Sequence, residues 1–169
     1  PADKGPIISV RAVRFDGARS TPLHFPHVGG LDVRGCTVTD VIPRPIDIPW
    51  SDGDTLPFQA GIVVGNRIDY PKAPLKRAVT GTVRIEDNRF LMENNRPEGV
   101  AGYGVVADWT WGAEITIARN TIHRSSRNGI EVLDNVRSDK GKGSIDISGN
   151  RITTDEEGIA WPHKFGPNG

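Results

Sequence analysis

Hydrophobic and polar residues alternate in short stretches that recur along this chain. Three stretches share the pattern I-x-I-x-x-N-x-I, at residues 83–90, 115–122 and 145–152, and their asparagines, Asn88, Asn120 and Asn150, are 32 and 30 residues apart. Alternation with a period of two places the apolar side chains on one face of a strand. A repeat of about thirty residues built from such strands is typical of a solenoid.

A second pattern, a glycine followed by apolar-x-apolar, follows the first in each repeat. It occurs at Gly61–Val64, Gly104–Ala107, Gly129–Val132 and Gly158–Trp161. The steps between these glycines are 43, 25 and 29 residues. Each repeat is therefore predicted to contain three short strands, separated by a tight turn at the asparagine and by two looser loops.

The asparagine has two expected roles at the turn. Asparagine tolerates a left-handed backbone better than other residues with a side chain, and stacked asparagines can hydrogen-bond between neighbouring coils at about 4.8 Å. The same template fits residues 31–38, with Cys36 at the asparagine position, and residues 8–15, with Val13 there. We expect Cys36 and Val13 to pack inward. The prediction is an all-β protein, a right-handed parallel β-helix of about five coils with incomplete first and last coils.

The interval from Cys36 to Asn88 spans 52 residues, which is too long for one coil. Proline cannot donate to a central sheet, so the proline-rich segments 43–57 and 69–76 are expected to loop out of a single domain covering residues 1–169. In a competing register, Val64–Ile68 would copy the turn at residues 147–152. Because the chain begins at Pro1 rather than methionine, we expect a processed protein or part of a longer one.

Together these elements resemble the right-handed parallel β-helix of the pectate-lyase-like superfamily, over roughly residues 7–161. The resemblance implies that the Gly-Ile strands form the sheet that carries substrate clefts. It also favours an extracellular or cell-surface location. The same architecture serves polysaccharide lyases, glycoside hydrolases, phage tailspikes and adhesins, so it does not by itself imply a function. The galacturonase, alginate-epimerase and pectate-lyase calcium motifs are not found in this chain.

The overall composition narrows the classes of partner. The chain has 21 basic and 21 acidic residues and a formal net charge of zero, which argues against a nucleic-acid-binding protein. No apolar run is long enough for a membrane helix. The single cysteine, Cys36, excludes an internal disulfide and a cysteine-based zinc site. No cofactor is expected, although the acidic segments 52–54 and 155–157 are candidate calcium ligands if they are more than solvated loops.

The Gly-Ile strands supply the candidate catalytic residues. Glu131 lies at an outward position and Asp108 at a strand end on the preceding coil, which places them about 5 to 10 Å apart if the coils stack regularly. Two carboxylates at that separation can act as acid and base on a glycosidic bond. The alternative is that both are ordinary solvated surface charges.

Candidate binding residues lie in the adjoining loops. Trp109 and Trp111 share one side of an extended segment and would form a stacking platform for a sugar, or else local core. Arg127, with His123 and Arg124 nearby, would bind a sugar carboxylate, or else belongs to a solvated turn. Asp134 and His163 lie at strand ends of the same sheet, and further aromatic candidates are Trp50, Tyr103 and Trp161. His24 and His27 make only a weak metal motif.

Three functions are compatible with these features. The favoured hypothesis is a β-helix module of a larger protein that binds or presents to carbohydrate, with a polysaccharide or oligosaccharide as its partner and without evident catalysis. The alternatives are a polysaccharide lyase or glycoside hydrolase acting on an acidic polysaccharide, and an accessory scaffold for another protein. Open sheet edges at the two ends of the helix would also permit self-association.

Overall fold

The computed structural model describes residues 5–47, 55–65, 79–92, 101–108, 110, 112–125, 128–133, 143–154 and 159–160. These residues form strands, turns and bends, with no helix among them. Accordingly, no helix in the described part of the chain is long and apolar enough to cross a membrane.

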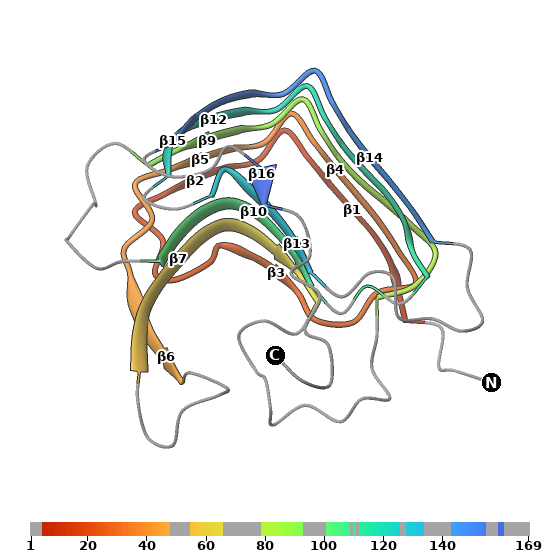
Figure 1. Ribbon diagram of the computed structural model, residues 1–169, viewed down its shortest axis with the longest axis horizontal. Coiled ribbons are helices and arrows are strands. Elements are labelled where there is room, and N and C mark those ends of the chain that lie inside the picture. The colour runs from red at the N-terminus through yellow and green to blue at the C-terminus, as the bar shows by residue number, and fades with distance from the viewer. Residues whose placement is uncertain are drawn as a thin grey trace.

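Three parallel sheets form the faces of a parallel β-helix, as the sequence predicts, and successive coils of the chain stack on one another (Figure 1). The first sheet contains, in spatial order, β1 (Ile7–Arg11), β4 (Gly30–Arg34), β8 (Thr82–Glu86), β11 (Glu114–Ala118) and β14 (Ser144–Ser148). The second contains β2 (Arg14–Asp16), β5 (Thr37–Thr39), β9 (Arg89–Leu91), β12 (Thr121–Ser125) and β15 (Arg151–Thr154). The third contains β3 (Leu23–Phe25), β7 (Thr55–Val64), β10 (Ala101–Asp108), β13 (Ile130–Leu133) and β16 (Ile159–Ala160), with β6 (Arg44–Asp47) beside β7.

Each coil contributes one strand to every sheet, so the five predicted coils are confirmed. The first and last coils, expected to be incomplete, also contribute all three strands. The register stacks equivalent apolar residues: Ile8, Leu31, Val83, Ile115 and Ile145 form one inward row. The inward-facing side chains of this sheet are buried in the three middle coils. In the two end coils, those of Ile8, Val10, Ile145 and Ile147 are only partly buried. Such open ends leave self-association as an untested prediction.

The asparagine ladder is confirmed in detail. The Asn120 Oδ1 accepts hydrogen bonds from both the backbone N–H and the side-chain amide of Asn88, each at 3.0 Å. The Asn120 amide donates in turn to the Ile85 carbonyl at 2.8 Å and to the Asn150 Oδ1 at 3.0 Å. Asn88 and Asn120 therefore each join their own coil to both neighbouring coils in a buried corner, where an unpaired amide would be costly.

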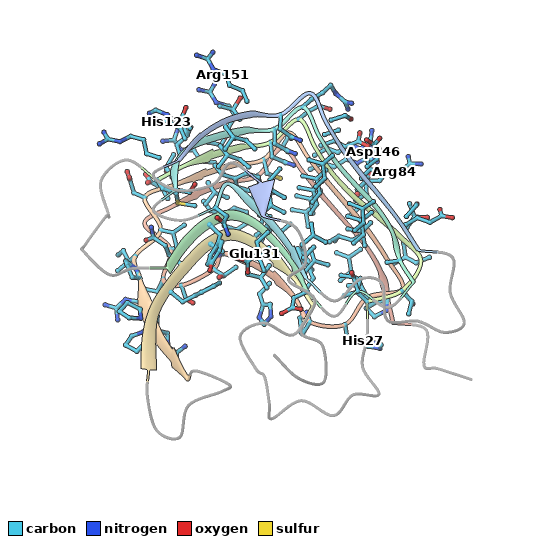
Figure 2. All side chains as sticks on the ribbon, viewed as in Figure 1. His27, Arg84, His123, Glu131, Asp146 and Arg151 are labelled. Atoms are coloured by element: carbon cyan, nitrogen blue, oxygen red, sulfur yellow. The ribbon has the colours of Figure 1, made fainter. Side chains whose placement is uncertain are left out.

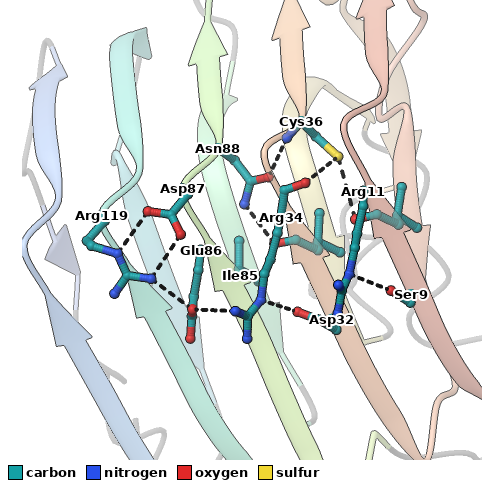
Figure 3. Close-up of polar contacts among 12 residues, drawn as sticks. Ser9, Arg11, Asp32, Arg34, Cys36, Ile85, Glu86, Asp87, Asn88 and Arg119 are labelled. Atoms are coloured by element: carbon teal, nitrogen blue, oxygen red, sulfur yellow. Dashed lines mark hydrogen bonds and ion pairs between the residues drawn. The ribbon is translucent and has the colours of Figure 1, made fainter.

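The ladder changes toward the first coil. Cys36 is fully buried, and its thiol donates to the Val10 carbonyl at 3.7 Å, the bond that an asparagine amide makes elsewhere. Its backbone N–H donates to the Asn88 Oδ1 at 2.9 Å (Figure 3). The expectation that Val13 packs inward was wrong, because Val13, on the outermost described coil, is 38% exposed.

The left-handed backbone at this corner belongs to the residue before the asparagine. Ala12, Gly35, Asp87, Arg119 and Gly149 have φ between 53° and 62°, one on each coil. The prediction that the asparagine itself adopts this conformation was therefore wrong. The asparagine is selected by its hydrogen bonds, and the preceding residue bends the chain.

The Gly-Ile pattern has a steric cause. A Cβ at Gly61 would clash with the Phe90 ring and the Gly104 carbonyl, and one at Gly104 would clash with Ile122 and the Gly129 carbonyl. The second and third sheets approach closely at this line, so only glycine fits there.

The insertion at residues 43–57 is partly ordered into strands, contrary to the expected loop. β6 pairs antiparallel with the start of β7, and Pro45 lies opposite Pro57. Proline is tolerated here because β6 is an edge strand.

The competing register would place Val64–Ile68 at an asparagine turn, with Val64 in the first sheet. The structure excludes this for Val64, which pairs with Ala107 in the third sheet. Residues 69–76 lie outside the described part of the chain.

Candidate functional site

The structure places the predicted catalytic residues on neighbouring strands. Glu131 on β13 is in register with Val106 on β10, and Asp108 is two residues further along β10. Residues two apart on a strand share a face, so both side chains belong to the outer face of the third sheet. Diagonal neighbours of this kind are about 7–8 Å apart between backbones. The pairing expected from the sequence is present, and its catalytic role stays a prediction.

Both carboxylates are buried rather than solvated, which excludes the surface-charge alternative. Asp108 is 3% exposed and Glu131 is 7% exposed. The Asn128 amide donates to the Glu131 Oε2 at 3.0 Å. Beside them, Val63 and Val106 form a second apolar cluster with Phe58, Ala60 and Tyr103. The outer face of the third sheet is thus covered over this strip and is not an open cleft.

Tyr103, expected to extend a sugar platform, packs against Phe58 with ring centroids 5.6 Å apart and is itself buried. Five other predicted binding residues lie outside the described part of the chain: Trp109, Trp111, Arg127, Asp134 and His163. The same holds for Trp50, Trp161 and the two acidic segments at 52–54 and 155–157. Within the described ranges, no three His, Cys, Asp or Glu residues are grouped to hold a metal ion.

The outer face of the first sheet carries charges that bind one another from coil to coil (Figure 3). Arg11 and Arg34 both pair with Asp32, and Arg34 also lies 3.5 Å from the Glu86 carboxylate. Arg119 contacts the Glu86 carboxylate at 2.9 Å and donates two hydrogen bonds to the Asp87 carboxylate, at 2.8 and 2.9 Å. This network crosses the first four coils.

The pKa values follow from these contacts. Burial acts to raise the pKa of Asp32, but hydrogen bonds and charges from Arg34 and Arg11 outweigh it and lower the pKa. The hydrogen bond from Arg119 lowers the pKa of Asp87. The pKa of Arg119 is raised by its bonds to Asp87 and then Glu86. These charges are committed to holding coils together.

The second sheet carries a different arrangement on its outer face. The register places Arg14, Thr37, Arg89, Thr121 and Arg151 in one row across its five strands. We call this row the arginine column. Its three arginines are exposed, and Figure 2 shows Arg151 pointing away from the helix.

These arginines have little competition from the protein. Within the described residues, Arg89 and Arg151 make no side-chain hydrogen bond or ion pair, and Arg14 has only a solvated contact with Asp16 at 3.9 Å. The five strands together carry four arginines, Arg124 included, and a single carboxylate, Asp16. An array of unpaired like charges on one face creates a local positive potential.

Comparison with known proteins adds one assignment. The family profile described as a protein of unknown function (DUF1565) matches residues 59–167, more than half of the chain. The chain belongs to the DUF1565 family. No curated protein and no solved structure matched the chain. The matched part of the DUF1565 domain includes Arg89, Thr121 and Arg151 but not Arg14 or Thr37.

The arginine column was missed in reading the sequence, although a signal was present. Arg89, Thr121 and Arg151 are the residues directly after Asn88, Asn120 and Asn150, a position that the repeat leaves variable. The net charge of the whole chain is zero, so it gives no indication of the excess of positive charge on the outer face of the second sheet. Only the register shows which positions form a row and which of them lack a carboxylate neighbour.

Proposed function

We propose that this chain is a non-catalytic β-helix module that binds an acidic polysaccharide along the arginine column. The proposal rests on Arg89 and Arg151, which are exposed and make no side-chain hydrogen bond or ion pair within the described part of the chain. A planar guanidinium binds a carboxylate or sulfate through two parallel hydrogen bonds. Three such groups in a straight row suit a linear polymer with repeated anionic groups better than a compact ligand.

An ordinary solvated surface is the competing explanation, and the first sheet argues against it. Its strands carry three arginines and four carboxylates. Arg11 and Arg34 pair with Asp32, and Arg34 also with Glu86, whereas Arg84, Glu114 and Asp146 make no ion pair within the described residues. The second sheet lacks this mixture. Leaving exposed arginines without counter-charges stabilises nothing in the fold, whereas it leaves their donors available to an external anion.

Binding of an acidic polysaccharide tests the proposal most directly. Affinity would be measured by titration calorimetry with polygalacturonate, hyaluronan and a carboxyl-reduced, neutral form of each. The double variant Arg89→Gln/Arg151→Gln should weaken binding of the acidic forms about tenfold or more. The matched control is Arg84→Gln, because Arg84 is exposed on the same coil as Arg89 but on the first sheet, in register with Asp32.

The outcomes separate the explanations. Tight binding of acidic but not neutral polymers, lost in the double variant and kept in Arg84→Gln, supports the module. Equal loss in both would indicate a diffuse charge effect. No binding of any acidic polymer overturns the proposal, and equally strong binding of a single-stranded oligonucleotide at the same salt would replace it with general polyanion binding.

The pectate-lyase-like superfamily is the second part of the proposal. The five coils, the three-sheet cross-section and the asparagine ladder support this placement. A crystal structure superimposed on members of that superfamily would test it, and a left-handed coil would exclude it.

An enzymatic function is the alternative, and the placement of two carboxylates on the third sheet supports it, although both side chains are buried. Glu131 and Asp108 are carboxylates on adjacent strands and one face, the arrangement needed for acid–base attack on a glycosidic bond. Trp109, Trp111, Arg127, Asp134 and His163 stay predicted substrate contacts. Release of reducing ends or unsaturated sugars, abolished by Glu131→Gln, would establish a hydrolase or lyase. Absence of product from pectin, alginate and glycosaminoglycans would leave the binding module.

A further inference from the structure

The spacing within the arginine column has a consequence for the ligand that it recognises. Neighbouring strands of the sheet are about 4.8 Å apart, so successive arginines, separated by one threonine strand, are about 9.6 Å apart. The row from Arg14 to Arg151 therefore spans about 19 Å over four strand spacings. It runs across the strands, parallel to the axis of the β-helix.

The threonines between the arginines are also available. Thr37 and Thr121 are half-buried, and neither hydroxyl has a hydrogen-bond partner among the residues that the structure describes. Like charges directly opposite each other on neighbouring strands destabilise a sheet, so alternation with threonine permits three arginines in one row. The column thus offers a cationic donor, a neutral hydroxyl and a cationic donor at even steps.

A linear polysaccharide has a matching period. A six-membered sugar ring with its linking oxygen is similar in length to one strand spacing, which is about 4.8 Å. A chain laid along the column would then present successive sugars to arginine and threonine in turn. Successive arginines would then lie two sugars apart. Each arginine would meet a carboxylate or sulfate when such groups project toward the column on every second sugar.

Building on the proposed function, we infer that the column binds a polysaccharide along the helix axis and recognises anionic groups that recur on one side at every second sugar. An alternating polymer of uronic acid and uncharged sugar has this chemistry. Arg89 occupies the decisive position, because every pair of arginines one period apart includes it. Arg14 and Arg151 each take part in one such pair.

Oligosaccharides of defined length test this spacing. The probes are hyaluronan tetrasaccharide and hexasaccharide, which carry two and three carboxylates, one on every second sugar. Wild-type protein offers the tetrasaccharide two equivalent positions, Arg14 with Arg89 and Arg89 with Arg151. Arg14→Gln or Arg151→Gln leaves one position and should weaken tetrasaccharide binding about twofold. Arg89→Gln leaves none and should weaken it about fivefold or more.

The three variants remove the same charge, so each serves as a control for the others. The hexasaccharide should bind wild type more tightly than the tetrasaccharide, and Arg14→Gln should remove most of that advantage. Equal weakening of the tetrasaccharide by all three variants would overturn the spacing inference while leaving the proposed binding function intact. Failure of both oligosaccharides and of every acidic polymer to bind would instead overturn the proposed function itself. Circular dichroism of each variant would confirm that the fold is retained.

Discussion

The first and second sheets are adjacent faces of one β-helix, yet they use charge in opposite ways. On the first sheet, Arg34 and Arg119 are held by carboxylates from their own and neighbouring coils. On the second, Arg89 and Arg151 are exposed and have no side-chain partner among the described residues. The difference teaches that a repeated scaffold fixes where side chains project but not whether they serve the fold or an external ligand.

The asparagine ladder, at the corner shared by both faces, should show the largest effect. Asn120→Ala removes four side-chain hydrogen bonds and leaves the buried Ile85 carbonyl and Asn88 N–H without their partners. We expect a loss of about 2–4 kcal/mol in the free energy of unfolding, measured by urea denaturation. Asn150→Ala is the control and should cost less, since Asn150 is half-buried and its side chain makes three such bonds. An equal cost would show that the ladder is not cooperative along its length.

A crossed pair of variants tests the contrast between the faces. Arg89→Gln should weaken binding of an acidic polysaccharide about fivefold with no change in the urea midpoint. Arg119→Gln should do the reverse, because it breaks the contacts with Glu86 and Asp87 and touches no residue of the column. If either variant changes both the affinity for the polysaccharide and the urea midpoint, the two sheets do not differ in the way proposed.

Acidification should affect the first sheet through its lowered pKa values. Asp32 and Asp87 have pKa values below their ordinary 3.8 in the fold, so folding favours their ionised forms. Their contribution to stability is present above pH 3.8 and is lost as the pH falls through this value toward the lower folded values. Urea midpoints measured from pH 6 to pH 3 should fall less for Asp32→Asn/Asp87→Asn than for wild type. Parallel decline in both proteins would assign the acid sensitivity to other groups.

The smallest expected change concerns Asp16, the carboxylate on the second sheet. It lies 3.9 Å from Arg14 in a solvated pair and accepts a hydrogen bond from Thr39 at 2.7 Å. Asp16→Asn should therefore raise the affinity for an acidic polysaccharide by only about twofold. Asp146→Asn on the first sheet is the matched control and should leave affinity unchanged. A loss of affinity in Asp16→Asn would mean that Asp16 positions Arg14 for the ligand.

Much of the fold is predictable because it depends on a short repeated pattern. The period-two alternation and the spacing of Asn88, Asn120 and Asn150 were sufficient to predict five coils and a side-chain ladder. The errors fall where the repeat is interrupted or incomplete. Residues 44–47 and 55–58 pair as an edge hairpin despite their prolines, and Val13 lies exposed on the outermost described coil.

The site was harder to predict because its properties depend on contacts between coils. Glu131 and Asp108 were correctly expected on adjacent strands of one face, but the pattern gave no sign that an apolar cluster around Val106 and Tyr103 adjoins them and that both are buried. The arginine column escaped notice because its successive arginines are 75 and 62 residues apart in sequence, and a long insertion separates the first two.

The sequence by itself therefore determined the coil, since alternation and turn chemistry are local and recur with each repeat. It also determined the candidate positions of the column, one residue after each asparagine. Only the tertiary structure decided which charges are neutralised, because an ion pair requires two groups within a few ångströms across coils that are distant in sequence. That is why Arg119 is held by Glu86 and Asp87, whereas Arg89 has no partner among the described residues and carries the proposed binding role.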